Sequence, residues 1–91
     1  MIYSAQLLGE PYYFYDAITS RTVFFVTREI NNDEYSPIFK KIDFKEGDVV
    51  LDIGANVGMV SILLVKKFPF LKIYSFEPMK NNYENLLKIL N

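Results

Sequence analysis

The chain has 91 residues, of which 51% are hydrophobic and 23% are charged, so its composition is that of one small globular domain and not of a disordered segment. A net charge of −1 without a basic cluster argues against nucleic-acid binding. The chain has no cysteine and no histidine, which excludes disulfides and metal sites built from thiolate or imidazole, so we expect no metal. Any general base would have to be a carboxylate, lysine or tyrosine.

The longest apolar stretch, residues 57–65, is interrupted by Ser61 and followed by two lysines. It is too short to cross a bilayer. The first residues have no basic leader with a cleavage-like site. We therefore expect no membrane segment and, by default, a cytoplasmic location.

Aromatic and β-branched residues dominate residues 12–15 and 21–30, and turn-forming residues lie between them. This pattern predicts a β-hairpin of these two segments. Residues 2–8, which are followed by Gly9, are a candidate edge strand. We interpret the aromatic side chains of both segments as core or interface rather than as the wall of a substrate site.

Residues 31–44 are expected to contain a short helix. Ser36 followed by Pro37 is typical of a helix N-terminus, and Asp33 is a rival cap one turn earlier. The apolar residues expected on the buried face of this helix are Ile38, Phe39 and Ile42.

The pattern then changes to strand, helix, strand and helix. Residues 49–53 form a continuous apolar run, typical of a parallel strand buried on both faces. Residues 56–68 predict a helix, 71–76 a second strand and 79–90 an amphipathic helix. This order predicts a βαβα unit with parallel strands. The apolar residues of the last helix include Met79, Tyr83, Leu86, Leu87 and Leu90, and we expect Met79, Tyr83 and Leu87 on its packed face.

Residues 49–58 read VVLDIGANVG, a strand that ends in an acid and a turn of small residues. Gly54 would allow a sharp turn without a Cβ in a ligand's way, and Gly58 would let the helix start close to the strand. Asp52 can face an ammonium group. The middle glycine of the G-x-G-x-x-G fingerprint is missing, which argues against a pyrophosphate ligand. S-adenosylmethionine, with its amino acid portion and no pyrophosphate, fits these features.

Glu77 ends the second predicted strand about twenty residues after the turn, where an acid in such folds accepts hydrogen bonds from ribose hydroxyls. Because adjacent parallel strands end at the same edge of a sheet, we expect Asp52 and Glu77 at one rim. The pair predicts that one carboxylate holds the ammonium end of a ligand and the other its ribose.

The chain resembles the FkbM family of S-adenosylmethionine-dependent methyltransferases in two segments, VVLDIGANVGMVSILL (49–64) and IYSFEP (73–78). The hallmarks of that family are Asp-x-Gly-Ala-Asn-x-Gly and Phe-Glu-Pro. The likeness is close over residues 30–91 and loose over 1–29. It implies an α/β fold with a partial Rossmann-like (class I methyltransferase) βαβα unit, preceded by a β-hairpin and a short helix. The positions that it assigns to the cofactor are Asp52, Gly54, Ala55, Asn56 and Gly58 around the methionine portion, Glu77 on the ribose, and Pro78 and Met79 near the adenine.

The resemblance further implies O-methylation of a hydroxyl on a sugar, glycan or natural product, so the partner would be a small-molecule or glycan acceptor. Residues 1–45 would be the N-terminal extension, and 46–91 the first half of the cofactor-binding domain. Because a complete member has a larger sheet, we expect a truncated unit without complete catalysis, and no catalytic residue is assigned. Two alternatives stay open: a non-catalytic remnant or interaction module, and a nucleotide binder of another Rossmann type. Unpaired strand edges suggest a homo-oligomer, unless the hairpin covers them.

Overall fold

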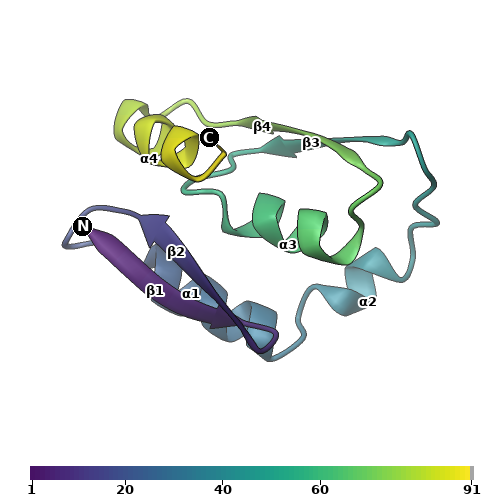
Figure 1. The fold of residues 1–91 in the computed structure, drawn as a ribbon, viewed down its shortest axis with the longest axis horizontal. Helices are drawn as coiled ribbons and strands as arrows, with labels where there is room; N and C mark the ends of the chain where they lie inside the picture. Colours follow the sequence, from purple (N-terminus) through teal and green to yellow (C-terminus); the bar gives the residue numbers. More distant parts are fainter. Residues whose placement is uncertain (91) are drawn as a thin grey trace.

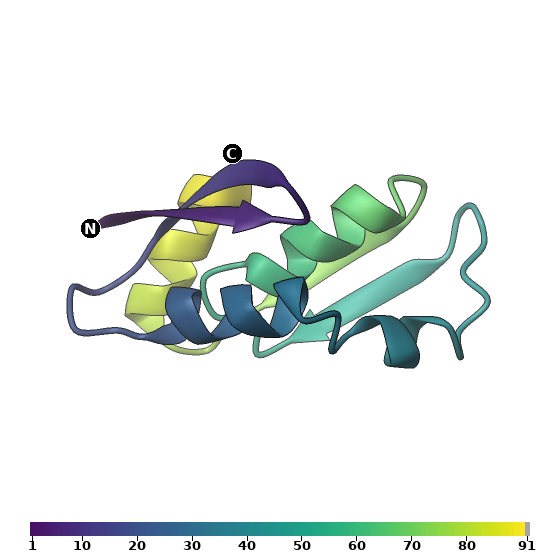
Figure 2. The ribbon, with the colours of Figure 1, turned by 90° about the horizontal axis from the view of Figure 1, so that it is seen from below.

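The computed structural model describes residues 1–90, which form an α/β fold with two two-stranded sheets and four helices. Helix α3 lies between the sheet of β3 and β4 and the N-terminal hairpin of β1 and β2 (Figures 1 and 2). None of the helices in this range has the length and apolar composition needed to cross a bilayer. The elements are β1 (Ile2–Leu7), β2 (Glu10–Tyr15), α1 (Thr22–Asn31), α2 (Ser36–Phe39), β3 (Val49–Ile53), α3 (Met59–Lys67), β4 (Lys72–Phe76) and α4 (Lys80–Leu90).

The N-terminal hairpin is formed by β1 and β2, which pair antiparallel along their whole length. Its loop consists of Leu8 and Gly9, both at positive φ (52° and 85°), as in the two-residue turns whose twist matches that of the flanking strands. The predicted pairing of residues 12–15 with 21–30 is therefore wrong. The partner of β2 is the segment 2–8 that we expected at an edge.

Residues 21–30, predicted as a strand, form helix α1. Val23 and Ile30 lie two turns apart and are both buried against the hairpin, whereas Phe24 and Phe25 point outward and are exposed. The helical spacing of the two apolar anchors outweighs the β-propensity of the segment, because packing decides between weak local preferences.

Helix α2 begins at Ser36, with Pro37 in its first turn as expected. Ser36 is not the cap, however, because Tyr35 occupies the N-cap position. The Ser36 hydroxyl donates instead to the carboxylate of Asp33. Two of the three residues predicted on the buried face are exposed, namely Ile38 and Ile42.

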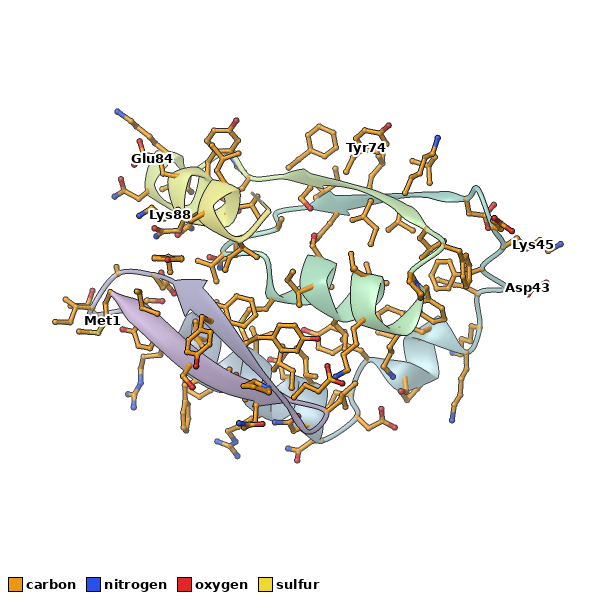
Figure 3. The ribbon with its side chains drawn as sticks, in the orientation of Figure 1. Met1, Asp43, Lys45, Tyr74, Glu84 and Lys88 are labelled. Carbon is orange, nitrogen blue, oxygen red and sulfur yellow. The ribbon has the colours of Figure 1, made fainter. Side chains whose placement is uncertain are left out.

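Strands β3 and β4 pair in parallel and are joined by α3, which confirms the predicted order of these elements. Alternate residues of both strands face α3, but the opposite face of the sheet is open, so burial on both faces was a wrong prediction. Tyr74 points away from α3 on this open face (Figure 3). The exposed apolar residues of the two strands, which we call the open face, are Val49, Leu51, Ile53, Tyr74 and Phe76.

Helix α4 forms where the sequence predicts an amphipathic helix, but only part of the predicted apolar set is buried, and the side chain of Leu90 lies outside the described residues. Leu86 is fully buried, and the three side chains predicted on the packed face are exposed. Those three residues are Met79, Tyr83 and Leu87.

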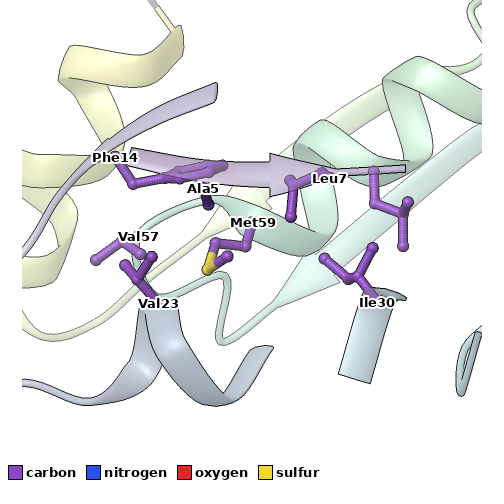
Figure 4. Packing of buried hydrophobic residues seen from close by; sticks show 8 residues of the cluster. Ala5, Leu7, Phe14, Val23, Ile30, Val57 and Met59 are labelled. Atoms are coloured by element: carbon purple, nitrogen blue, oxygen red, sulfur yellow. The ribbon is translucent and has the colours of Figure 1, made fainter. Parts of the chain in front are cut away.

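The hydrophobic core joins both halves of the chain (Figure 4). Phe14 is fully buried, and the aliphatic side chains around it come from β1, α1 and α3. At the edge of the core, Lys66 of α3 pairs with Glu10 of β2 at 2.8 Å. The N-terminal extension thus covers the side of α3 that faces away from β3 and β4. The buried cluster consists of Ala5, Leu7, Phe14, Val23, Ile30, Val57, Met59 and Leu63.

Candidate ligand-binding site

The residues predicted to bind a ligand meet at the carboxyl ends of β3 and β4. The parallel register sets Asp52 opposite Ser75 and Ile53 opposite Phe76. Asp52 and Glu77 therefore lie at the same rim of the sheet, as expected for parallel neighbours. We call this rim, with the turn that follows β3, the corner (residues 52–58 and 75–79).

Gly54 forms the tightest part of the corner. Its N–H and that of Ala55 both donate to the carbonyl of Phe76, at 2.8 and 2.9 Å, which ties the turn to the end of β4. Gly54 has φ of +75°, and a Cβ built there would have no atom within 4 Å. The predicted role of this glycine is thus compatible with the geometry, since the backbone bends sharply beside open space.

Glu77 holds the corner from the other side. Its Oε1 accepts the N–H of Asn56 and its Oε2 accepts the N–H of Met79, each at 2.8 Å. Asn56 is itself in the left-handed region, with φ of +55°. Because each carboxylate oxygen can accept a second hydrogen bond, these contacts orient Glu77 and leave it free to accept from a ligand hydroxyl.

Asp52 points from the inner face of β3 toward α3. Its Oδ2 accepts a hydrogen bond from the hydroxyl of Ser61 at 2.6 Å, and Ser61 lies 2.6 Å from the hydroxyl of Ser75. Ser61 is 1% exposed. Sequence reasoning missed this chain of polar groups, although a serine inside the apolar run 57–65 was a visible signal.

Gly58 has a different role from the predicted one. It is buried with φ of +98°, and a Cβ at this position would lie 2.8 Å from Cδ1 of Leu86. The close neighbour of the first turn of α3 is therefore α4 and not the strand.

Two hollows flank Gly54. The first, of about 160 Å³, extends from Asp52 and Asn56 to Thr22 and Val26 of α1. The participation of α1 was missed because its segment was predicted as a strand. The second hollow, of about 380 Å³, is lined by Ile53, Gly54, Phe76, Glu77 and Pro78. The side chain of Met79 is exposed.

Tyr35 adds to the electrostatics near Asp52. Its hydroxyl donates to Oε2 of Glu29 at 2.8 Å. Burial, the hydrogen bond to Glu29 and the negative charges of Glu29, Glu34 and Asp52 raise the pKa of Tyr35 to about 12. Tyr35 is thus a neutral hydrogen-bond donor at neutral pH and a poor general base.

The corner thus brings together two carboxylates, the bend at Gly54 and two flanking hollows. Across residues 1–90, three or more acidic side chains nowhere gather as a metal site would require. Comparisons of the chain with protein-family models, with curated proteins and with solved structures gave no match.

Proposed function

We propose that the corner binds S-adenosylmethionine and that the chain is the cofactor-binding part of a methyltransferase of the Rossmann-like class I type, similar to the FkbM family. One observation supports this above all: Asp52 and Glu77 end neighbouring parallel strands, with the bend at Gly54 between them. Folds of this kind bind ligands at the carboxyl ends of their strands.

The two hollows suggest how the ligand lies. The ammonium group would enter the smaller hollow and face Asp52, close to the turn of Ala55 and Asn56. The ribose would donate its hydroxyls to Glu77, and the adenine would rest in the larger hollow against Phe76 and Pro78. Contact of the adenine with Met79 stays a prediction.

The charge of the site supports a cationic ligand. S-adenosylmethionine bears a sulfonium and an ammonium group, and its sulfonium supplies an electrophilic methyl group. Asp52 lines the smaller hollow, and Glu77 lines the larger one. A nicotinamide dinucleotide, with an anionic pyrophosphate, would meet these carboxylates unfavourably.

Methyl transfer needs the acceptor, the methyl carbon and the sulfur held in line away from water. In the described part of the chain, Gly54, Phe76 and Pro78 are exposed, so the corner covers a ligand from one side only. We therefore assign cofactor binding to these residues. Transfer to a hydroxyl of a sugar, glycan or natural product would require additional covering of the site.

Isothermal titration calorimetry with S-adenosylhomocysteine tests the proposal. We expect a Kd of the order of 10 μM, or about −7 kcal/mol. Glu77→Ala should abolish binding because it removes the ribose acceptor and the support of the turn. Gly54→Val should do the same by filling the space beside the bend. Glu46→Ala, in the exposed turn at the other end of β3, is the control and should bind like the wild type.

The same titration separates the alternatives. Binding of NAD in place of S-adenosylhomocysteine would indicate another Rossmann-type nucleotide binder. An absence of binding to either compound would indicate a non-catalytic interaction module. The observation that favours this second candidate is the open face, whose apolar side chains lack a covering layer in residues 1–90. Self-association, through this face or through the strand edges, would then appear as a concentration-dependent mass in light scattering.

A further inference from the structure

The polar chain behind Asp52 has a defined direction. Ser61 has a single hydroxyl hydrogen, which it donates to Oδ2 of Asp52. In the contact between the two serine hydroxyls, Ser75 must therefore be the donor and Ser61 the acceptor. The chain runs from Ser75 through Ser61 to Asp52, and each hydrogen bond polarises the next.

Neither serine is required by the element on which it lies. Ser61 is the only polar residue between Met59 and Val65, where alanine would be a better helix former. Ser75 lies on the face of β4 that is turned to α3. Burying the hydroxyl of Ser61 beneath the sheet is unfavourable unless it is hydrogen-bonded, and its acceptor here is Asp52, a residue of the candidate site.

The contact fixes Oδ2 of Asp52, and within residues 1–90 Oδ1 accepts no hydrogen bond. Oδ2 is held by Ser61 on the buried side, while Asp52 also lines the smaller hollow beside Gly54. A carboxylate held in one rotamer can meet an ammonium group without losing further rotational freedom.

We propose that Ser61 and Ser75 are positioning residues that set the carboxylate of Asp52 for the ammonium group of an adenosyl amino acid. This inference rests on the proposed function, which it deepens: the site would select ligands by their amino group as well as by their nucleoside. The serines act only through Asp52, so their replacement should affect ligands that contain the ammonium group and leave the others unchanged.

A pair of probes isolates this effect. S-adenosylhomocysteine and 5′-methylthioadenosine share the adenosine and the thioether, but only the first has an amino acid portion. Ser61→Ala should weaken binding of S-adenosylhomocysteine roughly tenfold, the equivalent of about 1.4 kcal/mol, and change that of 5′-methylthioadenosine by less than about twofold. Ser61→Thr, which keeps the hydroxyl, should restore most of the affinity.

Asp52→Asn provides the coupling test, because its amide oxygen can still accept from Ser61 while the charge is lost. In this background, Ser61→Ala should have no further effect on S-adenosylhomocysteine. Ser4→Ala, at an exposed serine of β1, is the matched control. If circular dichroism shows that Ser61→Ala does not fold, Ser75→Ala provides the same comparison with a smaller loss.

Each outcome decides the proposal. A selective loss for S-adenosylhomocysteine that disappears in Asp52→Asn supports it. Equal losses for both probes, or no loss for either, would overturn the positioning role and leave the proposed function intact. Failure of the wild type to bind either probe would overturn the proposed function, and the positioning role with it.

Discussion

The replacement Gly58→Ala tests how the corner is joined to α4. The added Cβ would lie 2.8 Å from Cδ1 of Leu86, which is closer than real Cβ contacts allow. Leu86 is 1% exposed and would have to turn within a packed core, which costs about 1 kcal/mol. Alanine at φ of +98° adds about 1–2 kcal/mol of backbone strain. We expect a total destabilisation of about 2–3 kcal/mol.

Gly54→Ala is the matched control. It imposes comparable backbone strain at φ of +75°, but its Cβ would meet no atom within 4 Å. Unfolding in urea should therefore show a loss of about 1–2 kcal/mol for Gly54→Ala and about 1 kcal/mol more for Gly58→Ala, a difference of roughly 4–8 °C in Tm for a domain of this size. Equal losses in the two variants would refute the close contact between α3 and α4.

Three further predictions concern charge and the open face. Lys66 lowers the pKa of Glu10 below 4.5, so the ion pair stabilises the fold above pH 4.5 and this stabilisation is lost as the pH falls through the lowered pKa. In an NMR titration, Lys66→Met should return the pKa of Glu10 toward 4.5. An unchanged pKa would contradict the ion pair. Burial and Glu29 raise the pKa of Tyr35 to about 12, so the stability that Tyr35 contributes is complete below pH 10 and lost toward pH 12. In unfolding curves at alkaline pH, Tyr35→Phe should abolish this loss of stability. A loss that persists in the variant would contradict the raised pKa of Tyr35. Leu51→Ser, on the open face, should change stability by less than about 0.5 kcal/mol and reduce binding of the dye ANS; a large destabilisation would mean that this face is covered.

The parallel unit could be predicted because its signals are local and agree with one another. The apolar run before Asp52, the small residues after it and Pro69 after the lysines each mark the end of an element. The structure shifts the start of α3 to Met59, since Asn56 and Gly58 adopt left-handed conformations that a helix cannot contain. The rim position of Glu77 followed directly from this order.

The N-terminal half was harder to predict because its tertiary contacts decide between two local preferences. Residues 21–30 have β-branched and aromatic side chains, but packing on the hairpin selects a helix. The hydroxyl of Ser20 accepts the N–H of Thr22, so the supposed hairpin turn precedes this helix. The wrong assignment of α1 then concealed the contribution of Val26 to the smaller hollow.

Two predictions were wrong for one shared reason: the packing of Met79, Tyr83 and Leu87, and the burial of β3 on both faces. Apolar periodicity shows which side chains can be covered, and it does not show what covers them. Leu86 is buried because α4 lies on Gly58, whereas Leu87 and Leu51 are apolar and exposed. The polar chain through Ser61 was missed because its three members are distant in sequence and meet only after the strands pair.

Chemical-shift mapping with S-adenosylhomocysteine on the ¹⁵N-labelled chain tests the central claim most directly. The amide of Asn56, bound to Glu77, and the amide of Gly54 should shift with the added compound and saturate together, while amides of β1 stay unchanged. The phenylalanine-lined hollow at the opposite end of the strands, around Phe44 and Phe68, provides an internal comparison. Shifts confined to that hollow, or no saturable shift at the corner, would contradict the binding of an adenosyl amino acid there.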